Sequence, residues 1–543
     1  MRPTLLIALA AFLTSTATGQ QDDKVLRLFV FAGQSNMVGA DAKAADIGNF
    51  PGFEGVEKPQ PAVRYWYMLG RPEPKHNSGT WIALAPDHHG RFGPELTFAR
   101  TISKSIKAPI AIIKSAWGGT TLAKDWDPDA PSEKTLFSRT LQLIQKARAD
   151  LTRRGIKHRL EAFVWHQGEN DMLNRDLMKG YGKRLKAFLA RWRKELKAPQ
   201  LKCLIGEISG KGIWGLDHRR NMQTVRKQQR DVTTADPLAW FVPTSHLAFE
   251  VMGHGQPHYH FGTEGQLHHG VAYAQAYLSA MKVAPTATQQ GSVSSYKKGE
   301  RVRVFIVAGQ RSAEGDRCYV AQIPKRDRAI LATKVPFHFR LAGGLHQGVS
   351  TLQPQTAHDR FGPELSLGKT LHDASRGSKI TIIKVTHSAA MLADWLPNPS
   401  NASRPQYQGS IAFIRKALAA MSDQGAQPSL EAVFWIPGEH DCWWGSFRQR
   451  YAEDLTTLVT SMRKDLNSPK LKWLVAELPD NMRWGTEQLA KFDVQIGKVA
   501  AADPLLWFVP TNSIAIPKNS VTFGTQGTIK LGRLLAKHYL ALQ

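Results

Sequence analysis

The chain contains an internal repeat, and this repeat constrains the fold more than any other feature of the sequence. The hexapeptide RFGPEL at Arg91–Leu96 recurs at Arg360–Leu365, and the segment Ala235–Thr244 recurs at Ala502–Thr511. The offset between matching segments falls gradually along the chain, as small deletions in loops would produce. A chain of 543 residues is also too long for one ordinary core. The sequence therefore predicts two copies of one domain.

We place the first domain at residues 24–284 and the second at residues 301–543. Residues 285–300 between them are dominated by Pro, Thr, Gln, Gly, Ser and Lys, which is typical of a linker. At the N-terminus, Arg2 precedes an apolar run and then small residues, which predicts a signal peptide at residues 1–19. We expect a secreted or periplasmic protein without stable membrane insertion.

Within each copy, strand-like runs alternate with helical runs. In the first copy the expected strands are Leu26–Phe31, Pro109–Lys114, Leu160–Trp165, Leu201–Ile208 and Leu238–Pro243. The expected helices are Ser132–Leu151, Lys179–Leu196 and Gly265–Met281. This alternation predicts an α/β fold, with a parallel sheet covered by helices on both faces. Ligands of such sheets bind beyond the carboxyl ends of the strands.

Ser35 stands where the first strand ends, in the sequence Gly33-Gln34-Ser35-Asn36-Met37. A serine there is either the N-cap of a following helix or a nucleophile beside backbone N–H groups. In RFGPEL, by contrast, both copies agree, and the sequence Gly-Pro-Glu is typical of a helix start with a structural role.

The differences between the copies separate candidate chemistry from scaffold. Four residues of the first copy that suit acyl transfer are replaced in matching frames of the second. The second copy has Arg311 for Ser35, Ala389 for Gly119, Pro437 for Gln167 and Thr522 for His260.

These four residues supply the parts of an ester-cleaving site. A serine nucleophile needs an imidazole base, and the tetrahedral intermediate needs hydrogen-bond donors. We expect Ser35 as nucleophile and His260 as base. The expected oxyanion hole consists of the N–H groups of Ser35 and Gly119 and the side chain of Gln167.

The sequence resembles the SGNH hydrolases on four motifs that cover most of residues 24–283. They are Gly33–Met37, Gly118–Thr120, Trp165–Asp171 and a late histidine. The most similar branch contains the sialate O-acetylesterases and the acetylxylan esterases of carbohydrate esterase family 6. The resemblance implies flavodoxin-like α/β/α sandwiches and hydrolysis of O-acetyl groups on sugars without metal or other cofactor. It implies the same roles for Ser35, His260, Gly119 and Gln167 of the first copy. The second copy matches the family only in its frame, and since it lacks all four residues we expect it to be a degenerate pseudo-enzyme.

The acidic member of the triad is less clear in the sequence. Many SGNH enzymes have Asp three residues before the catalytic His, where this chain has Pro257. In the related acetylxylan esterases the Glu of the His-Gln-Gly-Glu motif can serve, which points to Glu169. The second copy keeps Glu439 at that position, which favours a structural role. Asp171, or a histidine oriented without a carboxylate, are the alternatives.

Several histidines invite a metal site: His246, His254, His258, His260, His268 and His269. No Asp or Glu cluster completes a tetrahedral ligand set, so we expect no metal and no effect of chelators. His268 and His269 fall on an expected helix, where a solvated or capping role is common. The three cysteines cannot form a disulfide framework, and Cys203 is expected to pack in a strand.

The net charge of +26 is spread along the chain, without a basic block or a basic-aromatic ladder. We therefore expect no nucleic-acid partner, and consider acidic polysaccharide as a partner instead. The expected substrate is an acetylated carbohydrate. The competing hypothesis is a non-catalytic carbohydrate-binding protein that uses the 15 tryptophans for stacking. In the second copy, Arg311 either offers a cation to an anionic sugar group or is a plain surface or salt-bridged arginine.

Overall fold

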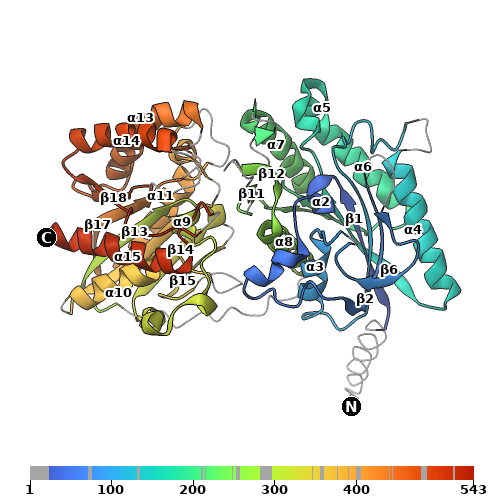
Figure 1. Ribbon diagram of the computed structural model, residues 1–543, viewed down its shortest axis with the longest axis horizontal. Helices are drawn as coiled ribbons and strands as arrows, with labels where there is room; N and C mark the ends of the chain where they lie inside the picture. Colours follow the sequence, from blue (N-terminus) through green and yellow to red (C-terminus); the bar gives the residue numbers. More distant parts are fainter. Residues whose placement is uncertain are drawn as a thin grey trace, which may run out of the picture. The chain divides into compact units, whose positions relative to one another are not determined.

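A computed structural model of the chain is shown in Figure 1. It describes residues 24–70, 76–87, 89–130, 135–209, 212–213, 216–247, 249–251, 257–281, 296–344, 346–354, 360–375, 377–388, 390–398, 405–438, 441–442, 444–478, 486–517 and 520–543. The expected signal peptide and residues 285–295 of the expected linker lie outside these ranges, as do His254, Ala389 and Glu439. The chain divides into two compact units. The main segments of the first are Met1–Asn49, Phe53–Glu250 and His258–Thr286, and that of the second is Ala287–Gln543.

The first unit is built on one mostly parallel sheet. Its strands, in spatial order, are β10 (Ala239–Val242), β7 (Lys202–Gly206), β6 (His158–His166), β1 (Leu26–Gly33), β5 (Ile110–Trp117), β2 (Gln60–Gly70) and β3 (His76–Asn77), and β4 (Ile82–Leu84) also pairs with β2. The strands from β10 to β2 are parallel, and β3 and β4 add an antiparallel edge. Two small two-stranded sheets lie outside the main sheet: β8 (Gly212–Ile213) with β9 (Leu216–Asp217), and β11 (Phe249–Val251) with β12 (Pro257–Phe261).

Helices cover both faces of this sheet (Figure 1). They are α2 (Ser35–Val38), α3 (Glu95–Ile102), α4 (Leu136–Arg153), α5 (Arg175–Lys179), α6 (Tyr181–Glu195), α7 (Arg219–Ala235) and α8 (Thr263–Ala280), with 3-10 turns η1 (Ala44–Asn49) and η2 (Asp171–Leu173). The predicted alternation of strands and helices is therefore confirmed, although β2 and α7 were not predicted.

Strand β1 is buried along its whole length because it lies at the centre of the sheet. Its alternate side chains point to opposite faces. On one face, Phe29 and Phe31 contact the ring of Phe98 of α3, with ring centroids 5.0 Å apart in each pair. On the other face, Val30 and Ala32 join the core under α4, α6 and α7. Both layers of helices are thus held by apolar packing on the same strand.

The second unit repeats this architecture. Its sheet has the order β15 (His346–Thr351), β14 (Pro336–Leu341), β16 (Lys379–Thr386), β13 (Arg301–Gly309), β17 (Gln427–Ile436), β18 (Lys472–Ala476) and β19 (Leu506–Val509), and only the pairing of β15 with β14 is antiparallel among these described strands. Its helices are α9 (Arg311–Glu314), α10 (Glu364–Ala374), α11 (Tyr407–Asp423), α13 (Gly445–Asp465), α14 (Thr486–Ala502) and α15 (Gly524–Ala541), with 3-10 turns η3 (Val320–Gln322), η4 (Lys325–Ala332), η5 (Ala342–Gly344) and η6 (Leu392–Trp395). The two units therefore confirm the predicted tandem α/β/α fold.

The repeated RFGPEL motif begins a helix in both units, as predicted. In the first unit, Glu95 opens α3 and forms a fully buried ion pair of 2.6 Å with Lys114 of β5. Glu364 and Lys384 form the same pair at 2.8 Å in the second unit. Burial lowers the pKa of Lys114, although Glu95 acts against that shift. Because both copies keep the pair, we interpret it as scaffold.

The second unit begins before the end of the expected linker. Tyr296 is buried in the core of this unit, and its hydroxyl lies 2.9 Å from that of Thr381. Cys203 is buried in β7, as predicted, and the three cysteines are not paired with one another. Among the described residues, no helix has the length and apolar character needed to cross a membrane.

Candidate active site

The topology of the first sheet brings three of the candidate residues to one edge. Strand β1 pairs with β5 on one side and with β6 on the other, in parallel. Ser35, Gly119 and Gln167 follow the carboxyl ends of these three neighbouring strands. Strands β5 and β2 lie on one side of β1, and strands β6, β7 and β10 lie on the other. At such a change of strand order, α/β sheets open a crevice for ligands.

Ser35 is the first residue of helix α2, and Gln34 is the N-cap. The N-cap interpretation of Ser35 is therefore wrong. The turn requires Gly33, whose φ is +151° and whose Cβ, if present, would lie 2.1 Å from the carbonyl oxygen of His166. This close approach joins the end of β1 to the end of β6 and fixes the serine at the sheet edge.

Asn36 connects the serine turn to the strand that carries the candidate base. The N–H of Phe261 donates to Oδ1 of Asn36 at 2.9 Å, and Nδ2 of Asn36 donates to the carbonyl oxygen of Tyr259 at 3.4 Å. His260 lies between these two residues on β12. The backbone on both sides of His260 is therefore bonded to the residue that follows Ser35.

The carboxylate beside His260 is that of Asp41. Oδ2 of Asp41 lies 3.1 Å from Nδ1 of His260, and Asp41 forms a backbone bridge with Gly262. Sequence reasoning missed Asp41, although the comparison of the two copies contains the signal. The second copy has Arg317 at the matching position, so the carboxylate and the serine are lost together.

Glu169 lies deeper than the triad role assigned to it from the resemblance would suggest. It is fully buried, and its Oε1 accepts from Nδ2 of Asn36 at 2.8 Å and lies 3.1 Å from Nε2 of His166. Burial raises the pKa of this carboxyl, but the His166 ring and the Asn36 amide outweigh burial and hold the pKa below its usual value. The charge of Glu169 is thus stabilised by two groups under the serine turn.

The side chain of Gln167 is directed into the protein. Its Nε2 donates to Oδ2 of Asp171 at 2.6 Å and to the carbonyl oxygen of Thr120 at 2.9 Å, and the residue is completely buried. Both amide hydrogens therefore have acceptors within the protein. Gln167 holds the loop that contains Gly119, whose φ of +73° is readily adopted by glycine.

Asp171 belongs to the same buried group. Its Oδ2 also accepts from the N–H of Leu122 at 2.9 Å, and burial raises its pKa against this hydrogen bond and that of Gln167. In the second unit, Asp441 accepts from the N–H of Leu392 at 3.0 Å. Since both copies keep this contact, it supports a structural role for Asp171.

Those candidate metal-binding histidines whose side chains the structure describes are not brought together as a ligand set. Among the described residues, no group of three or more His, Cys, Asp or Glu side chains could hold a metal ion. His269, expected to be solvated or to cap its helix, is instead completely buried in α8, with its ring centroid 4.7 Å from that of His166. Burial, together with His166 and Lys114, lowers the pKa of His269 well below its usual value. The side chain of His258 lies outside the described part of the chain.

The corresponding edge of the second unit carries a different buried network. Arg311, in place of Ser35, is 5% exposed. Asp316 lies 3.4 Å from Nη1 of Arg360 and accepts from the hydroxyl of Ser388 at 3.0 Å. The N–H of Ser388 donates to Glu314 at 3.0 Å. In the second unit, charged side chains and their partners thus occupy the positions that correspond to the surroundings of the serine turn in the first unit.

The chain is similar to several known proteins, each over about half of its length. A probable carbohydrate esterase of Arabidopsis thaliana is 24% identical over 273 residues, which are 47% of this chain and 90% of that protein. Among solved structures, an Arabidopsis thaliana protein is 22% identical, covering 47% of this chain and 98% of its own, with a TM-score of 0.36. A carbohydrate acetylesterase from Xanthomonas citri is 18% identical, covering 51% of this chain and 61% of its own, with a TM-score of 0.35.

One family matches the chain twice, over residues 25–279 and residues 301–541. These two segments correspond to the two structural units and together span most of the sequence. The family is described as carbohydrate esterase, sialic acid-specific acetylesterase. The chain is therefore a tandem member of the sialic acid-specific acetylesterase family of carbohydrate esterases.

Proposed function

We propose that the first unit is a serine esterase that removes O-acetyl groups from sugars through an acetyl-Ser35 intermediate. The observation that carries this proposal is the pair of hydrogen bonds between the side chain of Asn36 and the backbone of Tyr259 and Phe261. It joins the turn of the nucleophile to the strand of the base, two segments that are far apart in the sequence. The family of the chain and the loss of both residues in the second copy support the same assignment.

In the proposed reaction, the Ser35 hydroxyl attacks the acetyl carbonyl carbon while Nε2 of His260 takes its proton. The N–H groups of Ser35 and Gly119 stabilise the resulting oxyanion. The imidazolium then returns the proton to the sugar oxygen as that C–O bond breaks, which leaves acetyl-Ser35. A water molecule, deprotonated by His260, attacks this ester, and acetate and the free serine are released.

We assign to Asp41 the role of orienting His260, because its Oδ2 lies beside Nδ1 of the ring. An acceptor at Nδ1 selects the tautomer whose Nε2 can accept the serine proton. Glu169, the competing assignment, is then a positioning residue that acts through Asn36. Gln167 is likewise assigned a positioning role, because it holds the Thr120 carbonyl next to Gly119.

We propose that the second unit has no esterase activity, because Arg311 cannot act as an acyl nucleophile and Thr522 cannot act as a base at neutral pH. The apolar run near Arg2 supports export of the chain by a cleaved signal peptide at residues 1–19.

Acetate release from a panel of acetylated sugars, including acetylated xylan and O-acetyl sialic acid, tests the activity and identifies the sugar. Labelling with a serine-directed phosphonate separates the esterase from a non-catalytic carbohydrate-binding protein. The esterase should be labelled on Ser35, and a Ser35→Ala variant should not. Binding of acetylated sugars with neither acetate release nor labelling would favour the binding protein.

A further inference from the structure

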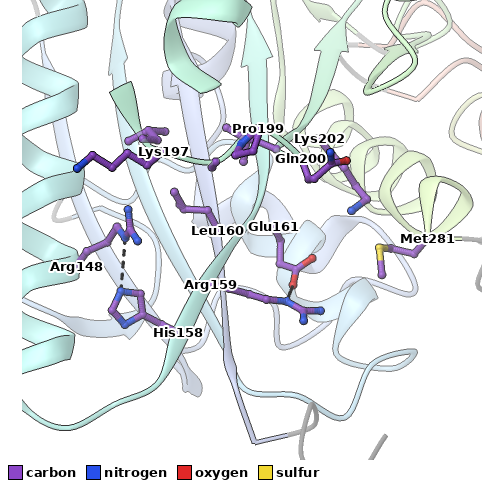
Figure 2. A pocket seen from close by; sticks show the side chains of 13 residues that line it. Arg148, His158, Arg159, Leu160, Glu161, Lys197, Pro199, Gln200, Lys202 and Met281 are labelled. Atoms are coloured by element: carbon purple, nitrogen blue, oxygen red, sulfur yellow. Dashed lines mark hydrogen bonds and ion pairs between the residues drawn. The ribbon is translucent and has the colours of Figure 1, made fainter. Parts of the chain in front are cut away.

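The first unit has a cavity of about 400 Å³ that is separate from the candidate active site (Figure 2). It lies at the amino ends of β6 and β7, whereas Ser35 lies at the carboxyl edge of the sheet. We refer to this cavity as the rear pocket, and its charged or titratable lining residues are Arg148, His158, Arg159, Glu161, Lys197 and Lys202.

The lining of the rear pocket is strongly cationic. Two arginines and two lysines face a single carboxylate, that of Glu161. Glu161 is already compensated, because its Oε1 pairs with both Arg27 and the lining residue Arg159, and its Oε2 accepts from the hydroxyl of Tyr277 at 3.0 Å. The cations of the lining that do not pair with this carboxylate are Arg148, Lys197 and Lys202. In the view of Figure 2, Lys197, Arg148 and His158 follow one side of the pocket, and Lys202 lies on the other. The pocket therefore presents positive charge from two sides.

The second unit provides an internal comparison, because its backbone matches the first at these positions. His158 and Arg159 pair with the first residues of β1 in the same register as Pro428 and Ser429 pair with β13. At this matched backbone the second copy replaces most of the basic lining by uncharged residues. It has Leu418 for Arg148, Pro428 for His158, Ser429 for Arg159 and Asn467 for Lys197. Lys202 is matched by another lysine, Lys472, and at one position the second copy gains a charge, with Lys470 for Gln200.

The backbone of Lys197, one of the basic residues of the rear pocket, has an unfavourable conformation for a lysine. Its φ is +51°, in the left-handed region that residues with a Cβ rarely adopt. Asn467 has a φ of +50° at the matching position, and asparagine tolerates this conformation better than lysine does. The first unit therefore has a lysine at a position where the fold itself favours Asn or Gly. Such an exception to local preference indicates a functional constraint.

We propose that the rear pocket binds an oxyanion group, sulfate or carboxylate, carried by a glycan. Guanidinium and ammonium groups on two sides of a cavity suit an oxyanion, and the volume lies in the range of small-ligand pockets. That the oxyanion belongs to a glycan rests on the proposed function. The site would hold an anionic sugar chain on a part of the first unit distant from Ser35, so that the enzyme remains on an acidic polysaccharide while it removes acetyl groups.

Isothermal titration of the full chain with four probes tests this proposal: inorganic sulfate, a sulfated oligosaccharide, an oligosaccharide of uronic acids and a neutral oligosaccharide of equal length. The test variant is Lys197→Asn with Arg159→Ser, which introduces the residues of the second copy and so preserves the backbone. The matched control is Lys104→Gln with Arg153→Gln, which removes the same charge from exposed positions outside the pocket.

We expect the anionic oligosaccharides to bind and the neutral one not to bind. The test variant should lose about 10-fold or more in affinity, and the control should change by less than about 2-fold. Acetate release from a small neutral acetylated sugar should be unchanged in both, so a failed esterase assay and a failed anion site are distinguishable. Binding that is equal in the test and control variants, or equally tight for the neutral probe, overturns the proposal. Binding of inorganic sulfate alone overturns its glycan part.

Discussion

Asp41 and His260 lie 3.1 Å apart, from Oδ2 to Nδ1, whereas Glu169 contacts the ring of His166. This pairing predicts that Asp41→Asn lowers kcat by about 10² to 10⁴-fold, because the base loses the carboxylate that orients it. Glu169→Gln keeps an acceptor for Asn36 and should cost less. Single-turnover and steady-state rates of acetate release measure both. A larger loss for Glu169→Gln than for Asp41→Asn would return the acid role to Glu169.

Ser35→Ala and His260→Ala should each lower kcat by orders of magnitude, while the thermal unfolding midpoint stays close to that of the unmodified protein. Each variant removes one participant in proton transfer without disturbing the backbone bonds of Asn36. His258→Ala is the matched control on the same strand and should be mild. If His258→Ala is as damaging as expected for His260→Ala, and His260→Ala is mild, the base is misassigned.

Gln167→Leu should lower kcat with little change in KM, because the Thr120 carbonyl loses its donor and the Gly119 N–H moves away from the oxyanion. The buried Asp171 also loses a hydrogen bond, so the free energy of unfolding should fall by about 1–3 kcal/mol. Asp171→Asn is the control, since it weakens the same bond without freeing Thr120. It should lower stability more than it lowers kcat. Equal losses of kcat in the two variants would contradict the positioning role.

His269 should make the first unit sensitive to acid. Its pKa is lowered in the folded state first by burial and then by His166 and Lys114, whereas in the unfolded chain it is about 6.5. Below that pH the unfolded state binds a proton that the folded state excludes, so stability falls as the pH falls. The slope contributed by His269 is up to about 1.4 kcal/mol per pH unit.

His269→Leu copies Leu531 of the second unit and should remove this part of the slope. Urea unfolding at pH 7.5 and pH 5.5 measures the difference, and we expect the variant to lose less stability between the two pH values. An identical loss in both proteins would show that His269 titrates normally in the folded state.

Residues 296–543 expressed alone should fold, because this unit has its own sheet and core. This fragment should be more stable than residues 301–543 by about 2 kcal/mol, since the shorter one lacks the buried ring of Tyr296. Neither should release acetate from acetylated sugars, and Arg311→Ser alone should not rescue activity. Acetate release by either fragment would contradict the pseudo-enzyme proposal.

The sequence predicted the elements whose patterns are local. The apolar run of β1 and the repeat itself were sufficient for the fold, and Cys203 was correctly placed in a buried strand. Strand β2 was not predicted, because it begins with Gln60, Pro61 and Ala62, which form no apolar run, and Arg64 interrupts the apolar residues that follow. Helix α7 was not predicted because polar and charged side chains dominate its sequence.

The site was predictable to the level of residue types but not of partners. Asp41 is six residues from Ser35 in the sequence, and nothing local shows that it faces a histidine more than 200 residues later. Gln167 was expected to point at the substrate, but a buried amide takes the acceptors that the fold offers, and here these are Thr120 and Asp171. His269 was expected to be solvated or to cap its helix, because the burial of a polar side chain in a helix depends on tertiary neighbours that the local sequence does not show.

The buried pair of Lys114 and Glu95 has a consequence for how this fold changes. Nζ of Lys114 also donates to the carbonyl oxygen of Val38, and Lys384 does the same to Glu314 in the second unit. The end of the short helix after the first strand is thus fastened from the core side in both copies. Residues at the other end of that helix can be exchanged without loss of the turn. After a gene duplication, one copy can therefore carry a serine and the other an arginine on the same supported turn. Later substitutions can introduce new chemistry at that turn while the sheet beneath stays the same.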